Sequence, residues 1–331
     1  LSKLESTEVL MSPERKHVFV SKRSGKYDLY KVDVDGKNEE KIVSGSGFER
    51  EDTMALIPHP DKNFVAYIST RENTRGADGS LLNVLSLVDV EKNELTRIAS
   101  SERVQVVDWI GDRLIYVRIA EGAKQDDTSR HRLLSYDISS GSEKELASTN
   151  YFNDVVVARG AIYYSPAAHK VNGSVGLFKV NADGSSRKTV VDKEVWNMFR
   201  TDYEKLHASI GQDWYELNLA NDSFSRVGGA PPSLKSRVYV ESGDRKQSLW
   251  VDERDGKGVL LLVQAPGKDE RILASLGGLK NPVRWLDSDH VIYRVSGNGE
   301  TADYVVSLSG GEPKKIRDVT NAAGIDRWYY Y

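Results

Sequence analysis

The sequence predicts an all-β fold, a seven-bladed β-propeller of four-stranded antiparallel blades, with six or eight blades as alternatives. One observation is a strand, turn and strand pattern that recurs seven times along the 331 residues. Another is its spacing of 56, 48, 44, 37, 46 and 44 residues, counted between Val32, Val88, Tyr136, Val180, Leu217, Val263 and Ser307. Repeats of ~40 to 50 residues made of short strands, without helical stretches between them, are typical of propeller blades.

The first copy of the pattern is LYKVDVDGKNEEKI at residues 29 to 42. Apolar residues lead into Asp35-Gly36, a dipeptide typical of a tight turn between two strands. Asp33, Asp35 and Gly36 could also begin a calcium-binding loop, but no acidic residue closes that loop at the spacing of an EF-hand. We therefore predict a hairpin here.

Six further hairpins are predicted by the same pattern: LSLVDVEKNELTRI (85–98), LLSYDISSGSEKEL (133–146), LFKVNADGSSRKTV (177–190), WYELNLANDSFSRV (214–227), LLLVQAPGKDERIL (260–273) and YVVSLSGGEPKKI (304–316). A turn followed by a strand precedes each hairpin: SPERKHVFVS (12–21), PHPDKNFVAYIS (58–69), WIGDRLIYVR (109–118), VARGAIYYS (157–165), TDYEKLHASI (201–210), ESGDRKQSLWV (241–251) and LDSDHVIYRV (286–295). Apolar residues ahead of these turns predict one more short strand, so each repeat holds four.

The phrases SPERKHVFVS and PHPDKNFVAYIS resemble the Ser-Pro-Asp-Gly-Lys and strand phrase of TolB-type propeller repeats. The resemblance extends over nearly the whole chain, although the full phrase never appears intact. The repeat is shared by periplasmic TolB, by propeller domains of prolyl oligopeptidase-family hydrolases and by many cell-surface proteins. It therefore implies a propeller of a bacterial protein located outside the cytoplasm, whereas fold alone does not specify the function.

An unbroken repeat predicts one propeller domain over residues 1–331. The last segment, 319–331, contains Trp328 followed by three tyrosines. Four consecutive aromatic side chains are unfavourable in water. We expect this segment to close the propeller by docking on the first blade, because a strand edge left open invites aggregation.

Composition excludes several classes of protein. The chain has 39% hydrophobic and 29% charged residues and a net charge of -3, without a basic field that would bind nucleic acid. No run of 18 apolar residues is present to span a membrane. The absence of cysteine excludes disulfides and thiolate metal sites. Because the chain begins LSKLESTEVL without a methionine, we expect a fragment or processed product whose missing front could hold a signal peptide or membrane anchor.

No local catalytic or metal-binding motif is found in the sequence. The six histidines are scattered without metal-ligand spacing, so no metal or other cofactor is expected. There is no Gly-x-Ser-x-Gly elbow, and the glycine-rich stretches do not open helices that would bind phosphate. Carboxylates from different blades could still converge at the central channel, so a glycan lyase or hydrolase remains an alternative.

Three long loops at equivalent places in consecutive repeats are the strongest functional signal. They are 69–83, 118–132 and 165–176, and we expect them to lie side by side on one face of the propeller, where binding residues usually gather. The candidate binding residues are Arg71, Arg75, Asp78, Lys124, Asp126, Asp127, Arg130, His131, His169 and Lys170. The leading hypothesis is a non-catalytic module, on the cell surface or in the periplasm, that recognises a protein or a glycan. A regulatory propeller of a longer protein is a third hypothesis.

Overall fold

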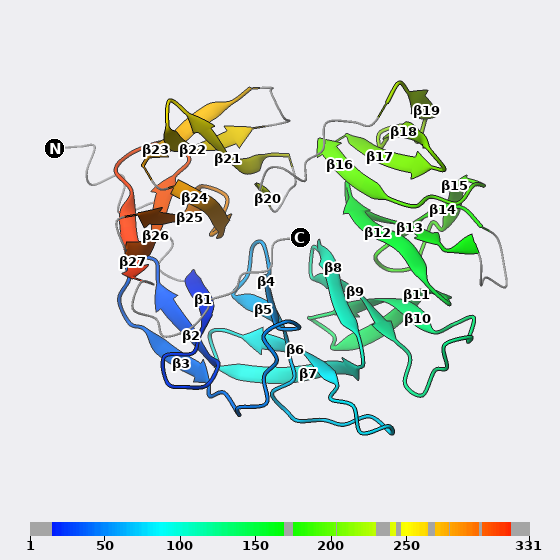
Figure 1. The fold of residues 1–331 in the computed structure, drawn as a ribbon, viewed down its shortest axis with the longest axis horizontal. Helices are drawn as coiled ribbons and strands as arrows, with labels where there is room; N and C mark the ends of the chain where they lie inside the picture. The colour runs from blue at the N-terminus through cyan, green and yellow to red at the C-terminus, as the bar shows by residue number, and fades with distance from the viewer. Residues whose placement is uncertain are drawn as a thin grey trace. The chain divides into compact units, whose positions relative to one another are not determined.

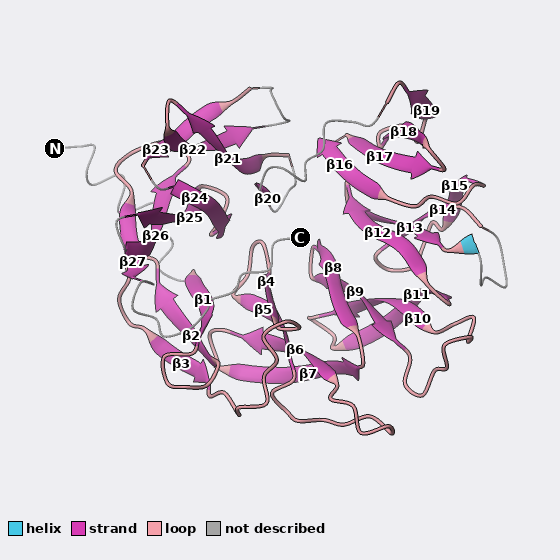
Figure 2. Cartoon of the chain, viewed as in Figure 1, coloured by secondary structure: helices cyan, strands magenta, loops and turns pink. Residues whose placement is uncertain are grey.

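The computed structural model describes residues 15–168, 175–202, 204–229, 239–242, 246–263, 269–277, 279–297 and 300–318. It confirms an all-β propeller of seven antiparallel sheets, six with four strands and one with three (Figure 1). Nearly all of the regular structure is strand (Figure 2). Within the described ranges, no helix is long and apolar enough to cross a membrane.

The chain divides into two compact units. Unit one comprises residues 1–73, 85–97 and 235–331. Its first sheet consists of β1 (Lys16–Ser21), β2 (Asp28–Asp33) and β3 (Glu40–Val43). The second sheet consists of β4 (Ala55–Pro58), β5 (Phe64–Ser69), β6 (Asn83–Asp89) and β7 (Glu94–Ser101), with the start of β6 and the end of β7 in unit two. The sixth consists of β20 (Tyr239–Glu241), β21 (Ser248–Arg254), β22 (Lys257–Val263) and β23 (Arg271–Leu276), and the seventh of β24 (Leu279–Trp285), β25 (His290–Gly297), β26 (Glu300–Ser307) and β27 (Lys314–Asp318).

Unit two comprises residues 74–84 and 98–234. The third sheet consists of β8 (Val104–Ile110), β9 (Arg113–Ile119), β10 (His131–Asp137) and β11 (Ser142–Thr149). The fourth consists of β12 (Phe152–Ala158), β13 (Ala161–Pro166), β14 (Leu177–Asn181) and β15 (Lys188–Val191). The fifth consists of β16 (Met198–Asp202), β17 (Lys205–Ile210), β18 (Asp213–Asn218) and β19 (Phe224–Val227).

All seven predicted hairpins and the strand before each of them are present in the structure. In the six complete sheets the strands pair in sequence order, so each sheet forms from a continuous piece of chain. The first sheet has three described strands, and the place of a strand ahead of β1 falls in residues 1–14, outside the described ranges. The segment 319–331 also lies outside them, so the proposed closure of the propeller stays a prediction.

The turn at Asp35-Gly36 is a hairpin turn, as predicted. The N–H of Gly36 donates to the carbonyl of Asp33 at 2.9 Å, and the N–H of Asp33 donates to the carbonyl of Lys37 at 3.0 Å. Gly36 has φ +79°, and a Cβ there would lie 2.1 Å from the carbonyl oxygen of Ile316 on β27. Only glycine therefore fits both the turn and the close approach of the seventh sheet.

Apolar side chains fill the space between neighbouring sheets inside each unit. In unit one, Leu29 and Tyr67 belong to a cluster between the first and second sheets, while Phe19 and Ile292 belong to one between the first and seventh. In unit two, one cluster joins the third and fourth sheets and another joins the fourth and fifth. The first and fourth sheets thus bury both faces by packing against their neighbours, as expected for repeated blades.

A buried ionic cluster lies between the first and seventh sheets. The carboxylate of Asp303, which is 0% exposed, accepts hydrogen bonds from Arg294 Nε at 2.7 Å and Nη2 at 3.0 Å. His17 Nε2 and Arg317 Nε each lie 3.5 Å from Asp303 Oδ2, and the Arg317 guanidinium stacks on Phe19. Burial alone would raise the pKa of Asp303, but hydrogen bonds from His17 and Arg294 outweigh it and hold the pKa well below its usual range.

Candidate binding site

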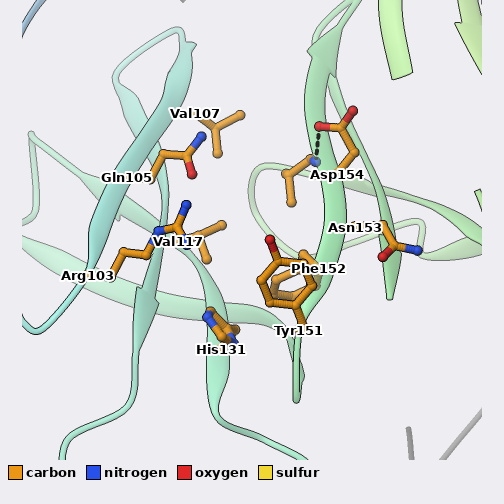
Figure 3. Close-up of a pocket in the computed structure, with 10 residues that line it drawn as sticks. Arg103, Gln105, Val107, Val117, His131, Tyr151, Phe152, Asn153 and Asp154 are labelled. Atoms are coloured by element: carbon orange, nitrogen blue, oxygen red, sulfur yellow. Dashed lines mark hydrogen bonds between the residues drawn. The ribbon is translucent and has the colours of Figure 1, made fainter. Parts of the chain in front are cut away.

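A cavity of about 230 Å³ opens between the third and fourth sheets, within unit two (Figure 3). Strand β8 forms one wall and the start of β12 forms the opposite one, with β9 and β10 behind them. The cavity is lined by Arg103, Gln105, Val107, Val117, His131, Tyr151, Phe152, Asn153, Asp154 and Val155. The lining combines apolar side chains with a few polar ones, which is common in small-molecule sites.

The alternation of β8 places its polar residues at the cavity. Val104 and Val106 are buried in the sheet packing, so Arg103 and Gln105 face the other way and remain exposed. Within the described part of the chain, neither side chain makes an ion pair or hydrogen bond. A guanidinium and an amide are therefore available to a ligand at this wall.

Tyr151 and His131 form the floor of the cavity, and the Tyr151 hydroxyl points towards its centre (Figure 3). Their rings meet edge to face with centroids 5.3 Å apart, and Tyr151 is 42% exposed. His131 Nδ1 donates to the carbonyl of Asn150, which fixes the tautomer and leaves Nε2 as an acceptor. Burial lowers the pKa of His131, and the nearby positive charges of Arg130 and Arg103 act in the same direction, so the ring is neutral at pH 7.

Asp154 supplies the carboxyl group of the site. One of its oxygens accepts the N–H of Val155 at 2.9 Å, drawn as the dashed line in Figure 3, and the other accepts the N–H of Met198 at 2.6 Å. Burial raises the pKa of Asp154, and these two N–H donors counter only part of the rise. This carboxyl group therefore takes up a proton at a higher pH than an ordinary aspartate does.

Asn153 connects the cavity to the next sheet. Its Nδ2 donates to Glu194 Oε1 at 2.9 Å and to the carbonyl of Val195 at 3.1 Å. Because Asp154 holds Met198 as well, two adjacent residues of the cavity wall fix the turn that leads into β16.

The loop 118–132 is ordered at the rim of the cavity. Asn150 Nδ2 donates to the carbonyls of Gln125 and Asp127, at 2.8 and 2.7 Å, immediately before the floor residue Tyr151. Inside the loop, Asp127 Oδ2 accepts the N–H of Lys124 at 2.8 Å. The predicted loop and the cavity therefore belong to one continuous surface.

The ten sequence-predicted site residues fall into three groups. Only His131 lines the cavity, while Lys124, Asp126, Asp127 and Arg130 lie in the adjoining loop, where Arg130 faces Glu102 at 3.8 Å. Three others do not line the cavity and form hydrogen bonds elsewhere: Arg71 donates to the carbonyl of Ser44, Arg75 to that of Gly79, and Asp78 accepts the N–H of Ser80. His169 and Lys170 lie outside the described residues.

Sequence reasoning missed Arg103, Tyr151, Asn153 and Asp154. All four come just before, or at the start of, the first strand of a four-stranded sheet. That position repeats with the blades, so the repeat itself was a signal that could have found them. Metal chemistry was not expected, and the described residues contain no group of three or more histidines and carboxylates that could hold an ion.

Comparison with solved structures identifies the same fold at low sequence identity. The propeller domain of the Trilobed protease from Pyrococcus furiosus is 11% identical, with a TM-score of 0.54 over 90% of this chain and 89% of that chain. An oligogalacturonate lyase in complex with manganese is 13% identical, with a TM-score of 0.50 over 89% and 86% of the two chains. A prolyl endopeptidase is 12% identical, with a TM-score of 0.51, but this chain spans only 50% of it.

TolB from Acinetobacter baumannii is also among the matched structures, at 13% identity and a TM-score of 0.41 over 86% of this chain and 74% of that chain. No protein-family model and no curated protein sequence matches the chain. The predicted propeller is thus confirmed as a fold, without a specific protein.

Proposed function

We propose that the protein is a non-catalytic binding module that recognises a glycan through the cavity between the third and fourth sheets. The exposed ring of Tyr151 carries this proposal, because a sugar ring can pack its C–H face on an aromatic side chain while its hydroxyls bind polar groups nearby. Gln105, Asp154 and the Nε2 atom of His131 provide such groups around Tyr151. A location outside the cytoplasm is part of the proposal and is supported by the TolB-like repeat.

Binding to a glycan array, compared between the parent protein and Tyr151→Ala, tests this proposal. We expect the parent protein to bind at least one glycan and the variant to bind it at least tenfold more weakly, a loss of about 1.4 kcal/mol. Phe48→Ala is the matched control, because Phe48 is an aromatic residue that is 48% exposed and does not line the cavity. Equal binding by both variants would exclude the cavity, and binding to proteins but to no glycan would favour the protein-recognition alternative.

A lyase or hydrolase acting at the same cavity is the second candidate. Asp154 favours it, because a carboxyl group whose pKa is raised by burial is suited to acid and base catalysis. The likeness to an oligogalacturonate lyase supplies a substrate to try, although it extends only to the fold. Formation of unsaturated ends from oligogalacturonides would establish a lyase, and new saturated reducing ends would establish a hydrolase. Either product, if absent in Asp154→Asn, would overturn the non-catalytic proposal.

A propeller attached to a further domain remains the third candidate. The prolyl endopeptidase match supports it, because there a chain of this length corresponds to half of a larger protein. The sequence of the full gene product would show whether another domain accompanies the propeller.

A further inference from the structure

The cavity is not the only exposed aromatic feature of unit two. Among the described residues of this unit, the large apolar side chains that are exposed are Tyr151, at 42%, and Trp196, at 50%. Tryptophan is highly buried on average, because its large ring is more favourable out of water. The exposed ring of Trp196 therefore offers an apolar surface on which a ligand could pack.

Trp196 occupies the same structural position as the residues of the cavity wall. Arg103 comes one residue before β8, Tyr151 one residue before β12, and Trp196 two residues before β16. These strands are the first of three consecutive sheets that are built in the same order, so their starting ends lie on one face of unit two. Arg103, Tyr151 and Trp196 thus form a row across that face.

Hydrogen bonds from two cavity residues fix the turn that contains Trp196. Asn153 binds Glu194 and the carbonyl of Val195, and Asp154 binds the N–H of Met198, so the turn around Trp196 is fixed from both sides. Trp196 adds a hydrogen bond from its backbone N–H to the carbonyl of Ser209 at 3.0 Å. Because packed sheets lie ~10 Å apart, the next ring of the row is within reach of a ligand that extends out of the cavity.

We propose that Trp196 is a second subsite and that the module binds an extended oligosaccharide rather than a single terminal sugar. This inference rests on the proposed glycan-binding function. The chemistry of the row favours an acidic chain: the Arg103 guanidinium, which has no ion-pair partner among the described residues, would hold a sugar carboxylate at one end. Tyr151 and Trp196 would then pack against the next sugar rings of the chain.

Calorimetric titration of the parent protein and Trp196→Ala with oligogalacturonides of increasing length tests the second subsite. We expect affinity for the parent protein to rise at least tenfold between the monosaccharide and the hexamer, and this gain to disappear in Trp196→Ala. The monosaccharide should bind both proteins equally. Trp196→Phe, which keeps an aromatic face, should recover most of the gain, and Phe48→Ala should behave as the parent protein.

The outcomes separate the two proposals. If affinity does not depend on length, or if Trp196→Ala keeps the gain, the second subsite is wrong while the cavity stands. If the neutral cello-oligosaccharides bind as well as the acidic series, the role of Arg103 is wrong. If the parent protein binds no oligosaccharide in either series, the glycan-binding function fails, and the second subsite with it. Unchanged urea midpoints of the variants confirm that the comparison is between folded proteins.

Discussion

Asp303 shows how much a single buried carboxylate can contribute to this fold. Its carboxylate faces His17 from the first sheet and Arg294 and Arg317 from the seventh. Each of these polar groups has lost contact with water through burial. A buried ion pair of this kind adds little compared with apolar packing, but removing one partner leaves the others uncompensated. The sequence did not reveal this cluster, because His17 is far from the other three residues in the chain and none of the four belongs to a motif.

Asp303→Asn should lower the free energy of unfolding by about 3–5 kcal/mol at pH 7, because the buried guanidinium of Arg317 and the partly buried one of Arg294 would lose their counter-charge. Urea denaturation measures this loss. Since the pKa of Asp303 is lower in the folded than in the unfolded state, its contribution is complete above the unfolded value of about 4 and decreases as the pH falls below it. The difference between variant and parent should therefore shrink at pH 3. Asp126→Asn, an exposed loop substitution, should change the midpoint little, and an equal effect of both would contradict the prediction.

At the scale of elements, the Asp35-Gly36 hairpin allows a controlled test. Gly36 and Gly79 have nearly the same backbone conformation, with φ of +79° and +80°, but a Cβ at Gly36 would meet the carbonyl of Ile316 while one at Gly79 would meet nothing within 4 Å. Gly79→Ala should cost about 1–2 kcal/mol for the left-handed backbone alone. Gly36→Ala should lower the free energy of unfolding clearly more, because the backbone carbonyl of Ile316 cannot move away from the new Cβ. Urea midpoints measure both, and equal losses would show that the contact with the seventh sheet does not matter.

The hairpins were predictable because their information is local. Alternating apolar residues and a turn dipeptide lie within fourteen residues, as in LFKVNADGSSRKTV, which became β14 and β15. The first strand of each sheet was harder to place: β16, MFRTD, shows no alternation and is recognised only by the turn and hairpin after it. The cavity forms where β8 and β12 pack together, and no short stretch of sequence contains both strands. Only the position of its residues at the start of these strands, which repeats with the blades, indicated them in the sequence.

At the scale of the whole molecule, Arg15 connects three sheets of unit one. It is 6% exposed, and it donates to the carbonyl of Leu286 at 2.7 Å, to that of Pro60 at 3.2 Å and to that of His59 at 3.5 Å. Its own sequence position is just ahead of β1. Elements that are separated by most of the chain thus share one donor, which favours cooperative unfolding of unit one.

Arg15→Met should lower the free energy of unfolding by about 2–3 kcal/mol, because buried carbonyls would lose a charged donor that the new side chain cannot replace. Arg226→Met is the control, since Arg226 pairs with Asp213 at the surface and such substitutions are usually within about 0.5 kcal/mol. Hydrogen exchange adds a spatial readout: protection should fall together in the first, second and seventh sheets. A loss confined to the first sheet would show that Arg15 does not couple them.

Asn153 and Asp154 also decide how the specificity of this protein could be engineered. Both line the cavity, and both hold the turn that carries Trp196, so replacing either would alter pocket chemistry and move an aromatic ring at the same time. The side chains of Arg103 and Gln105 make no hydrogen bond or ion pair with another described residue, so replacing them would not disturb such a turn. A library aimed at new ligands should therefore vary the β8 wall and leave the β12 wall as it stands.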